Sequence, residues 1–556
     1  MNELPKINSE GLRLAKRKAA ESVSSVVNVS KNNVFKLQST LMTHQVTGVQ
    51  RANGKAAFAY LCDMGVGKTL MLLAEYQQRV SKDDIMDLLV IAPKGCIRNW
   101  YYDREDAPSE ITKHLDPVLR KHLVVASSEG GAAARDARKI LLSTKDKPRA
   151  LFVNVEALSG SARMFDTCQE FLASGRALMA IDESTVIKSR KAQRTKSILH
   201  LGKLAKVRRI LSGLATPRSP MDLHAQFSFL DEKILGKSFT LFRARYAKME
   251  FICRAPDGVV NAQLRRAQSR TKVFTNTSNY TRTQKISLCY ALGGWIPDTA
   301  PIIAGYQRLP ELRDKIANHC YRVRKEDCLD LPPKIFQWRE VELTDEQKRI
   351  YKEVLEDATT ELSKYKFLTT TNAMEQILRL HQICCGHVPT EEGELIDLPT
   401  NRIDAVLEIL ADHEDKAIIW ATYQHDIQKI SEALREEYGK QAVAVFYGGN
   451  VKERNDDEAR FKTDPECRFM VATPAAGGLG MNWQVATLVV YASNNYDLAQ
   501  RLQSEDRAHR KGQTKSVTYV DIITRDTVEG KIIRALRSKM DLATTVTGEQ
   551  LRKWLV

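Results

Sequence analysis

The chain has 556 residues, 43% of them hydrophobic and 27% charged, which is typical of a soluble protein with about three or four domains. No apolar run approaches the ~18 residues that a membrane span needs, and ten scattered cysteines without a CxxC pair disfavour a disulfide framework. This composition excludes a membrane-spanning or disulfide-stapled protein and predicts a cytoplasmic one. The net charge of +16 favours a polyanionic partner, because Lys and Arg that neutralise phosphates release counterions; a basic surface without such a partner is the alternative.

The first 36 residues are polar and basic and predict an extension without a packed core. The stretch that follows, LMTHQVTGVQRA, predicts a helix that carries Gln45. The amide of Gln45 can offer an adenine edge both a donor and an acceptor, or it can cap its own helix. Both interpretations fit the residues.

A phosphate-binding loop is the chemical centre of the first half of the chain. It lies between the apolar runs 58–61 and 70–74, so that strand, loop and helix follow one another as the motif requires. Lys68 supplies a point charge and Thr69 a hydroxyl for Mg²⁺, while Cys62 stands where the full pattern has its first glycine. A Gly-rich turn before a core helix is the alternative. The predicted nucleotide contacts in this loop are Met64, Gly65, Val66, Gly67, Lys68 and Thr69.

Three further apolar runs, 87–92, 150–155 and 177–181, predict strands that alternate with helices. Such alternation predicts a doubly wound parallel sheet, whose ligands lie beyond the carboxyl ends of the strands. The last of these runs ends in Asp182 and Glu183. We expect Asp182 to hold Mg²⁺ and Glu183 to orient or deprotonate the attacking water, although paired acids at a strand end are also common helix caps.

Two segments predict contacts with nucleic acid. Residues 94–100, KGCIRNW, follow a strand and predict a loop with an exposed Trp100; a core position for this tryptophan is the alternative. Residues 240–320 lose the strand–helix rhythm and predict an insertion with a basic, nucleic-acid-facing side, or else a solvated basic surface. The basic residues of this insertion are Arg243, Arg245, Lys248, Arg265, Arg266, Arg270, Lys272, Arg282 and Lys285.

A second α/β series follows a helical stretch that begins at the predicted cap Thr344. Glycines after one of its strands, among them Gly480, allow the backbone to approach the nucleotide or a phosphodiester. Arg507 and Arg510 are three residues apart, so on a helix they share a face and can reach a γ-phosphate held by the other unit; a surface ion pair is the alternative. The predicted strands of this series are 417–420, 443–446, 469–472 and 487–491, and the predicted helices are 403–410 and 427–434.

These patterns predict an α/β protein with two tandem doubly wound parallel-sheet lobes, a helical and basic insertion between them, and a cleft at their junction. The expected divisions are an N-terminal extension (1–36), an ATP-binding lobe (37–235), an insertion and basic linker region (236–335), a helical linker (336–398), a second lobe (399–530) and a C-terminal helical tail (531–556).

Eight ordered motifs resemble those of Swi/Snf-type ATPases of helicase superfamily 2, from about Leu41 to Gly548. As they stand here they are HQVTGVQ, DMGVGKT, LVIAPKGCIRNW, DEST, LSGLATP, IIWATYQHDI, VATPAAGGLGMNW and QSEDRAHRKGQT. The segments YRVRKEDCLDLPPK and VELTDEQKRIY resemble the link between the lobes in that family. The short insert and the form GYQRLPELRDKI resemble bacterial and phage members.

The resemblance implies two RecA-like lobes, ATP with Mg²⁺, and translocation along duplex DNA. It implies that Gln45 recognises adenine and that Lys68 and Thr69 bind the triphosphate and Mg²⁺. It also implies that Asp182 holds the metal and that Glu183 is catalytic. On this basis the partner is duplex or branched DNA, with RNA as a second possibility, no membrane, and a monomeric protein.

The resemblance further implies that Arg510 is an arginine finger with Arg507 beside it. Three departures from the family pattern bear on this expectation. DEST replaces DEAH, so Ser184 or Thr185 must do what the family's histidine does; LSGLATP is two residues longer than LTGTP; and Cys62 stands where an acidic residue is common. The alternatives are an ATPase directed at RNA or RNA polymerase, a strand-separating helicase, and a DNA-binding module with a vestigial ATPase.

Overall fold

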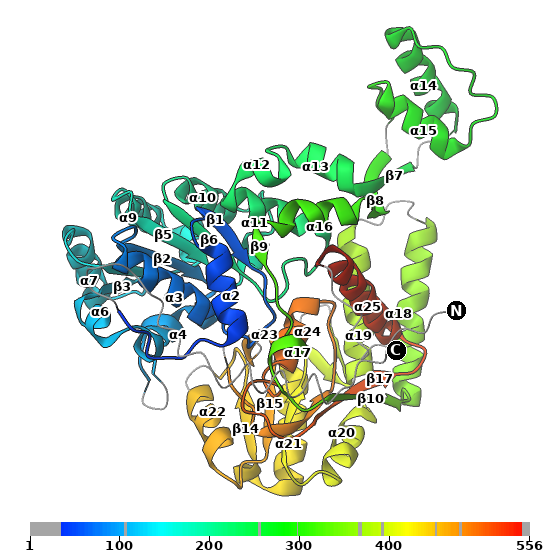
Figure 1. The fold of residues 1–556 in the computed structure, drawn as a ribbon. Coiled ribbons are helices and arrows are strands. Elements are labelled where there is room, and N and C mark those ends of the chain that lie inside the picture. The colour runs from blue at the N-terminus through cyan, green and yellow to red at the C-terminus, as the bar shows by residue number, and fades with distance from the viewer. Residues whose placement is uncertain are drawn as a thin grey trace, which may run out of the picture. The chain divides into compact units, whose positions relative to one another are not determined.

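The computed structural model describes residues 35–547 except 105–107, 254–256, 297–298, 365–369, 391–393, 451–452 and 478–480. The described residues up to Asp231 and from His319 to Thr544 form one compact unit, and Glu232–Asn318 form a second, unit 2. The first unit contains both predicted parallel-sheet lobes, which we call lobe 1 (35–231 with the strand at 320–321) and lobe 2 (334–544) (Figure 1). The predicted fold class is confirmed.

Lobe 1 is built on a seven-stranded sheet in the order β3-β4-β2-β5-β6-β1-β9, in which every neighbouring pair is parallel. The central strands β2 and β5 are buried along their whole length, as their continuous apolar sequences predict. The strands are β1 (Ala57–Tyr60), β2 (Asp87–Ala92), β3 (Val124–Ser127), β4 (Arg149–Asn154), β5 (Ala177–Ile181), β6 (Val207–Leu211) and β9 (Cys320–Tyr321).

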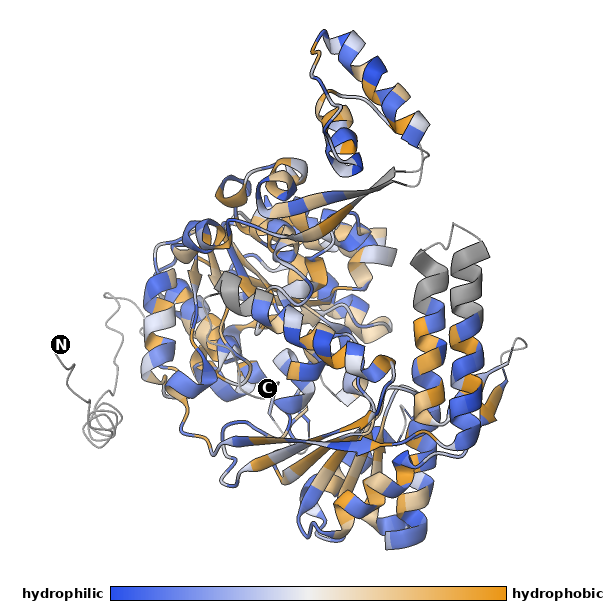
Figure 2. Ribbon diagram, turned by 90° about the vertical axis from the view of Figure 1, so that its right-hand side faces the viewer, coloured by the Kyte–Doolittle hydropathy of each residue, from blue (hydrophilic) through white to orange (hydrophobic). Residues whose placement is uncertain are grey.

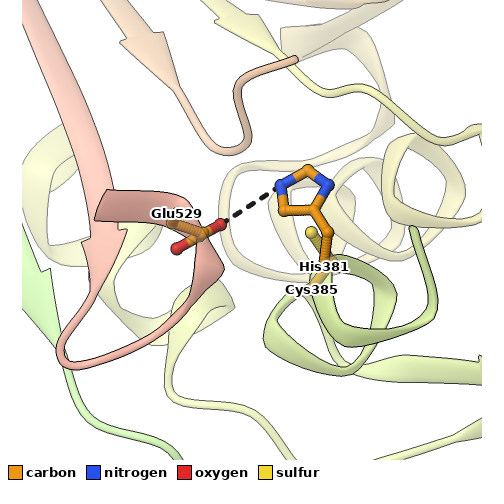
Figure 3. Close-up of side chains that lie close together, drawn as sticks. All are labelled: His381, Cys385 and Glu529. Carbon is orange, nitrogen blue, oxygen red and sulfur yellow. Dashed lines mark ion pairs between the residues drawn. The ribbon is translucent and has the colours of Figure 1, made fainter. Parts of the chain in front are cut away.

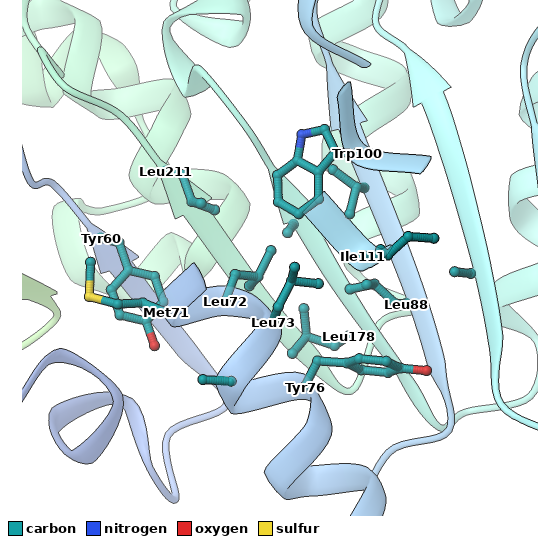
Figure 4. Packing of buried hydrophobic residues seen from close by; sticks show 14 of the residues in the cluster. Tyr60, Met71, Leu72, Leu73, Tyr76, Leu88, Trp100, Ile111, Leu178 and Leu211 are labelled. Atoms are coloured by element: carbon teal, nitrogen blue, oxygen red, sulfur yellow. The ribbon is translucent and has the colours of Figure 1, made fainter. Parts of the chain in front are cut away.

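Helices cover the lobe 1 sheet and are joined to it by an apolar core. The helix α3 packs Met71, Leu72, Leu73 and Tyr76 against the sheet (Figure 4). The helices are α2 (Thr43–Ala52), α3 (Lys68–Ser81), α4 (Lys94–Tyr101), α5 (Glu110–His114), α6 (Pro117–His122), α7 (Ala132–Ser143), α8 (Ala157–Gly160), α9 (Ala162–Leu172), α10 (Gln193–Gly202) and α11 (Leu223–Leu230), with 3₁₀ turns η1 (Ser184–Ile187) and η2 (Pro220–Asp222).

One charged group of α3 is fully enclosed in lobe 1. Glu75 accepts hydrogen bonds from Arg209 of β6, from Arg79 on its own helix and from the hydroxyl of Tyr60, and Arg209 has no exposed surface. A buried charge is tolerated only when it is paired and hydrogen-bonded. This network therefore ties the helix after the phosphate loop to two strands of the sheet.

Lobe 2 has a six-stranded parallel sheet in the order β10-β17-β16-β13-β15-β14. The strands are β10 (Lys334–Val341), β13 (Lys416–Trp420), β14 (Val443–Phe446), β15 (Phe469–Ala472), β16 (Ala486–Tyr491) and β17 (Val517–Thr524). Its shorter elements are α17 (Lys325–Cys328) in the link between the lobes, α20 (Arg402–Ala411), α21 (Gln424–Tyr438), η3 (Lys440–Ala442), α22 (Arg454–Thr463), α23 (Pro474–Gly477) and α24 (Leu498–Glu505).

Three long helices accompany lobe 2. The helices α18 (Asp345–Lys364) and α19 (Thr370–Cys385) lie side by side, and hydrophobic and hydrophilic residues alternate along both (Figure 2). Thr344 caps α18 by accepting the N–H of Gln347, as predicted. The ribbon β11 (His387–Pro389) and β12 (Leu395–Asp397) follows α19, and α25 (Val528–Thr547) ends the described chain.

Unit 2 overlaps the range 236–335 that the sequence assigns to an insertion, and most of it is helical. Its antiparallel strands β7 (Ala247–Cys253) and β8 (Thr299–Tyr306) form a ribbon. The helices are α12 (Glu232–Leu235), α13 (Phe239–Tyr246), α14 (Asp257–Thr271), α15 (Arg282–Ala291) and α16 (Leu309–Ala317).

Two strands lie inside ranges that the sequence assigns to linkers. β9 falls within the range 236–335 but pairs with β1 of lobe 1, and β10 falls mostly within the helical range 336–398 but pairs with β17. Both are edge strands. β9 has only two residues, and β10 is largely exposed, so neither has the continuous apolar run that predicts a buried strand. The chain thus returns to the first sheet before it enters the second. Among the described residues, no helix combines the length and the apolar character needed to cross a membrane.

Candidate nucleotide-binding site

A cavity of about 740 Å³ opens where the carboxyl ends of the lobe 1 strands face lobe 2. Its volume lies in the range of small-molecule sites, roughly 300 to 1,000 Å³. It brings together all but one of the residues predicted for nucleotide binding and hydrolysis; Gly480 lies outside the described residues. The predicted residues that line it are Gln45, Met64, Gly65, Val66, Gly67, Lys68, Thr69, Asp182, Glu183, Arg507 and Arg510.

The phosphate loop has the backbone conformation that its glycines permit. Gly65 and Gly67 have φ values of 77° and 88°, in the left-handed region, and Gly67 caps the N-terminus of α3. The N-terminus of a helix places free N–H groups and a partial positive charge where a phosphate can bind. The Lys68 ammonium donates to the carbonyls of Cys62 and Asp63, each at 3.0 Å, so a phosphate in the loop would compete with these carbonyls for its charge.

Gln45 supports this loop directly. Its Oε1 accepts the N–H of Met42 at 2.9 Å and so caps α2, while its Nε2 donates to the carbonyl of Val66 at 3.0 Å. A Cβ at position 67 would lie 2.2 Å from this Nε2, so a larger residue than Gly67 would displace the amide of Gln45. Gln45 therefore caps its own helix, which is one of the two roles that the sequence allows. Recognition of adenine by Gln45 stays a prediction.

His44 is a loop contact that the sequence did not single out. Its Nε2 lies 2.9 Å from the same Val66 carbonyl, and burial lowers the pKa of His44, which favours the neutral ring as a donor. A single histidine on a helix carries no distinguishing sequence signal. Two neighbouring side chains of α2 therefore fix the carbonyl in the middle of the phosphate loop.

Asp182 and Glu183 directly follow β5 and line the cavity. Asp182 Oδ2 accepts the indole N–H of Trp100 at 3.1 Å, and its Oδ1 accepts the N–H of Glu183 at 3.0 Å. Glu183 has a φ of 48°, which is strained for a side-chain-bearing residue and is typical of functional sites. Burial raises the pKa of both carboxyl groups, and the charge of Lys68 opposes this.

The expectation of an exposed Trp100 that contacts nucleic acid is wrong. Trp100 is 2% exposed and packs beside Phe152 in the lobe 1 core. Residues 94–101 form the helix α4 rather than a loop, and this helix turns the indole inward to Asp182. The core alternative is the correct one, and it gives Trp100 a role in orienting a predicted metal ligand.

Arg507 and Arg510 reach the cavity from lobe 2, but not on a helix as predicted. The helix α24 ends at Glu505, and both arginines lie in the turns that follow. Their guanidinium groups nevertheless meet, because Arg507 and Arg510 donate to the same carbonyl, that of Met481, at 2.7 and 3.0 Å. Burial and, next, the neighbouring charge of Arg510 lower the pKa of Arg507 to about 10. Such closely placed cations favour an anion between them.

Lys325 joins the phosphate loop to the arginine-bearing turns. Its backbone N–H donates to Asp63 Oδ2 at 3.1 Å, and its ammonium donates to the Asp506 carboxylate and, at 2.8 Å, to the carbonyl of His509. A Cβ at Gly65 would lie 3.8 Å from the ammonium. Burial lowers the pKa of Lys325 to about 8, although the nearby Asp506 raises it. The sequence places this lysine in the link between the lobes but gives no sign of these partners.

Ser184, in the DEST motif, is fully buried and hydrogen-bonded. Its hydroxyl donates to Gln226 Oε1 at 2.6 Å, and Gln226 Nε2 donates to the carbonyl of Ala215 at 2.7 Å. Ala215 belongs to LSGLATP, so the hydroxyl connects the two motifs through one glutamine of α11. Ser184, rather than Thr185, makes this connection.

The donors for Mg²⁺ fit the chemistry of that ion. Mg²⁺ prefers oxygen ligands and needs few of them from the protein. The Thr69 hydroxyl and the Asp182 carboxylate both line the cavity, and a cation beside Asp182 would offset the burial that raises its pKa. A bound Mg²⁺ would neutralise charge on the triphosphate.

A second group of possible metal ligands lies away from the nucleotide cavity. Ligand atoms of His381, Cys385 and Glu529 come within 4.8 Å of one another, and His381 pairs with Glu529 at 3.4 Å (Figure 3). Glu529 also accepts a hydrogen bond from the buried guanidinium of Arg402 at 2.7 Å. Burial alone would raise the pKa of Glu529, but Arg402 and His381 hold it at about 2. With Arg402 beside the carboxylate, and burial holding the pKa of the Cys385 thiol well above its usual value, the group is a buried ion-pair network that disfavours a cation.

The fold and the cavity define a two-lobed ATPase in which each lobe supplies part of the site. A family profile described as the SNF2-related domain matches residues 49–388, and one described as the helicase conserved C-terminal domain matches residues 401–512. The first match alone spans more than half of the chain. The protein belongs to the SNF2-related family and is a superfamily 2 ATPase.

Curated relatives share the sequence at low identity. The TATA-binding protein-associated factor MOT1 of Saccharomyces cerevisiae is 23% identical over 618 residues, which cover 98% of this chain and 30% of that protein. An uncharacterized ATP-dependent helicase of Mycoplasma genitalium is 28% identical over 226 residues, covering 40% of this chain and 21% of that protein. The chain thus spans less than a third of the length of these relatives. A solved structure described as the Sulfolobus solfataricus SWI2/SNF2 ATPase core in complex with dsDNA has 21% identity and a TM-score of 0.37, covering 94% of this chain and 96% of that one.

Proposed function

We propose that this protein is an ATP-driven translocase that acts on duplex or branched DNA. The observation that carries the proposal is the composite cavity, in which Lys68, Asp182 and Glu183 of lobe 1 face Arg507 and Arg510 of lobe 2. A site divided in this way is complete only when the two lobes approach, so nucleotide binding and lobe position depend on each other.

The proposed roles follow from the geometry. Lys68 and the N-terminus of α3 bind the triphosphate, with Gln45 fixing the loop that holds it. Glu183 orients or deprotonates the attacking water, and Arg510 stabilises the charge that develops on the transferred phosphoryl group. Asp182 and Thr69 hold Mg²⁺. Arg507 shares an anchor with Arg510 at the Met481 carbonyl and keeps it at the cavity.

DNA as the substrate is supported by charge and family. The net charge of +16 gives a polyanion a favourable counterion-release term, and the chain matches the SNF2-related domain, for which the sequence resemblance implies translocation along duplex DNA. The relatives named TATA-binding protein-associated factors suggest a protein partner on DNA as a further element of this proposal. The cytoplasmic, monomeric and bacterial or phage-like character of the protein stays a prediction.

The substrate is tested by ATPase rate across a panel of nucleic acids. We expect duplex and forked DNA to stimulate hydrolysis more than single-stranded DNA or RNA, and we expect displacement of a third strand from a DNA triplex in the presence of ATP. Stimulation by RNA alone would reject the DNA assignment in favour of an RNA-directed ATPase. Stimulation by duplex DNA without triplex displacement would reject translocation.

The site is tested by two substitutions with matched controls. Lys68→Ala should abolish DNA-stimulated hydrolysis but leave DNA binding, while Lys82→Ala, at the exposed far end of the same helix, should leave both. Arg510→Ala should lower kcat by about 10³ to 10⁵, the range seen when an arginine finger is lost. Arg534→Ala, on the exposed face of α25, is its control. Unchanged turnover in Lys68→Ala would remove the basis of the site assignment.

A further inference from the structure

Unit 2 carries a small module with its own core, the helical hairpin of α14 and α15, which we call the hairpin (residues 257–296). Its buried side chains are Val260, Leu264, Ala267, Ile286, Cys289 and Ile296. The packing is tight at Gly294, where an added Cβ would lie 2.6 Å from Cys289 Sγ and 2.8 Å from Ala267 Cβ. The hairpin therefore has a defined shape of its own.

The surface of the hairpin is strongly basic. It holds six Lys and Arg residues and one acid, Asp257, a net charge of +5 within a chain of net charge +16. The single acid already pairs with Arg282. The basic side chains are Arg265, Arg266, Arg270, Lys272 and Arg282, which are exposed, and Lys285, which is half-buried. This charge is complementary to a polyanion.

Three aromatic rings project from the same hairpin. Phe274 is 77% exposed, Trp295 65% and Tyr280 36%. Aromatic rings combined with a positively charged surface are what single-stranded nucleic-acid sites use, with bases stacked on the rings and phosphates on the cations.

The positions of these rings are fixed by the hairpin itself. The buried amide of Gln268 donates to the carbonyl of Thr275 at 2.9 Å, which anchors the loop just after Phe274. Arg270 donates to the carbonyl of Gly293, two residues before Trp295, while Ile296 on the other side enters the core. Hydrogen bonds thus hold the backbone beside Phe274 and Trp295, while both rings stay largely exposed.

We propose that the hairpin is a binding site for single-stranded DNA, with the phosphates on its Lys and Arg side chains and unpaired bases stacked on Phe274 and Trp295. Positive charge alone would suit a duplex or an acidic protein. Exposed rings add a requirement for flat π-surfaces, which unpaired bases offer and stacked base pairs do not. This site goes beyond the proposed duplex-directed ATPase, does not rest on it, and would let the protein engage the unpaired strand of branched DNA.

The test is the affinity of the full chain for a fluorescent oligothymidylate of about 15 nucleotides, measured by anisotropy without ATP. Phe274→Ala and Trp295→Ala should each weaken binding by about 5- to 150-fold, the effect of losing one base–aromatic stack. Leu241→Ala, a 72% exposed apolar residue of α13 in the same unit, is the matched control and should bind as wild type. Because all three side chains are exposed, the variants should keep their circular dichroism spectra and basal ATPase rates.

A second measurement tests the charge. Replacing Arg265 and Lys272 by Gln should lower the slope of log affinity against log salt by about 1.4, since each phosphate contact on a single strand contributes about 0.7. Wild-type affinity in the two aromatic variants would overturn the proposal, as would an equal loss of binding to a duplex of the same length. Tighter binding of oligouridylate than of oligothymidylate would overturn the choice of DNA. Lys68→Ala should bind the oligothymidylate normally, so a failure of the ATPase site and a failure of the hairpin are separable.

Discussion

Lys325 gives the sharpest test of how the two lobes are joined at the nucleotide site. It is 7% exposed, and its pKa is lowered by burial from 10.5 to about 8. Because one pKa unit corresponds to about 1.4 kcal/mol, keeping this ammonium charged costs roughly 3 kcal/mol. Side chains whose burial destabilises the native state by this much are commonly found at functional sites.

We expect Lys325→Met to impair catalysis far more than stability. The pKa of about 8 already includes the attraction of Asp506, so the roughly 3 kcal/mol is a net cost that an uncharged methionine does not carry. Lys334 stays 3.8 Å from the Asp506 carboxylate, and we therefore expect the free energy of unfolding not to fall. The bonds of the ammonium to Asp506 and to the His509 carbonyl are lost, however, while the backbone N–H of Lys325 that binds Asp63 is unaffected. The lost bonds hold the turns that carry Arg510, and a displacement of about 1 Å at a catalytic group costs roughly 10² in rate.

The assay is DNA-stimulated ATPase rate beside chemical unfolding of the same preparations. Lys334→Met is the matched control, because Lys334 binds Glu505 of the same segment at 2.9 Å and has no hydrogen bond to lobe 1 among the described residues. We expect this control to retain most of its activity. Wild-type kcat in Lys325→Met, or a loss of kcat that simply follows a loss of stability, would refute the reasoning.

The pH dependence of Lys325 has opposite signs for stability and activity. The titratable groups around its ammonium are Asp63, Asp506, Lys334 and His509, and burial lowers the pKa of His509 to about 4, so its ring is neutral over this range. Between pH 8 and 10.5 the unfolded chain keeps a proton that the native lysine has lost, so the stability of the wild type relative to Lys325→Met should rise with pH. Over the same rise Asp506 loses its charged partner. The ratio of the wild-type ATPase rate to that of Lys325→Met should therefore fall from pH 7 to pH 9. A ratio that does not change with pH would contradict this expectation.

Two further substitutions probe lobe 1. Glu75→Gln should lower the free energy of unfolding by about 3 to 5 kcal/mol in urea titrations, because it leaves the fully buried charge of Arg209 uncompensated, whereas Glu340→Gln, in an exposed ion pair, should change it by less than about 1 kcal/mol. Ser184→Ala should cost about 1 to 3 kcal/mol by leaving Gln226 Oε1 unsatisfied, and it should lower DNA-stimulated ATPase more than the basal rate; equal loss of both rates would remove the coupling role.

The elements of the sheets that are buried on both faces could be predicted from the sequence. Strands β5, β14 and β15 begin and end where their apolar runs do, because a strand covered by helices on both sides needs an uninterrupted hydrophobic sequence. β10 could not be predicted in this way. It is an edge strand with Trp338 62% exposed, so its sequence carries polar residues that obscure the pattern.

The candidate site was predictable in its parts but not in its long-range contacts. The phosphate loop is recognisable from its glycines, Lys68 and Thr69, and the two acids after β5 from the apolar run that precedes them. The indole of Trp100 binds Asp182 across 82 residues of sequence, and the ammonium of Lys325 binds Asp506 across 181. Neither contact has a local pattern. The turns that carry Arg507 are likewise set by a distant bond, in which the N–H of Trp483 donates to the Arg507 carbonyl.

Two departures from the family pattern meet at one place in the structure. LSGLATP is longer than LTGTP by two residues, which alignment of its flanking LSG and TP places at Leu214 and Ala215. Leu214 packs against apolar side chains of lobe 2, on α24 and α25. Ala215 presents its carbonyl to Gln226, the same glutamine that binds Ser184, the residue in place of the family's alanine in DEAH.

The longer loop and the altered motif are therefore joined by hydrogen bonds through Gln226. Full burial of a leucine side chain contributes about 1.5 to 3 kcal/mol. If moving lobe 2 exposed Leu214, the free energy lost would be similar to a typical coupling free energy between two sites, about 1 to 3 kcal/mol. Movement of lobe 2 against Leu214 would pull on Ala215, and through Gln226 on the hydroxyl next to the catalytic acids. Contacts therefore run from lobe 2 through Leu214, Ala215 and Gln226 to Ser184, the residue next to Glu183.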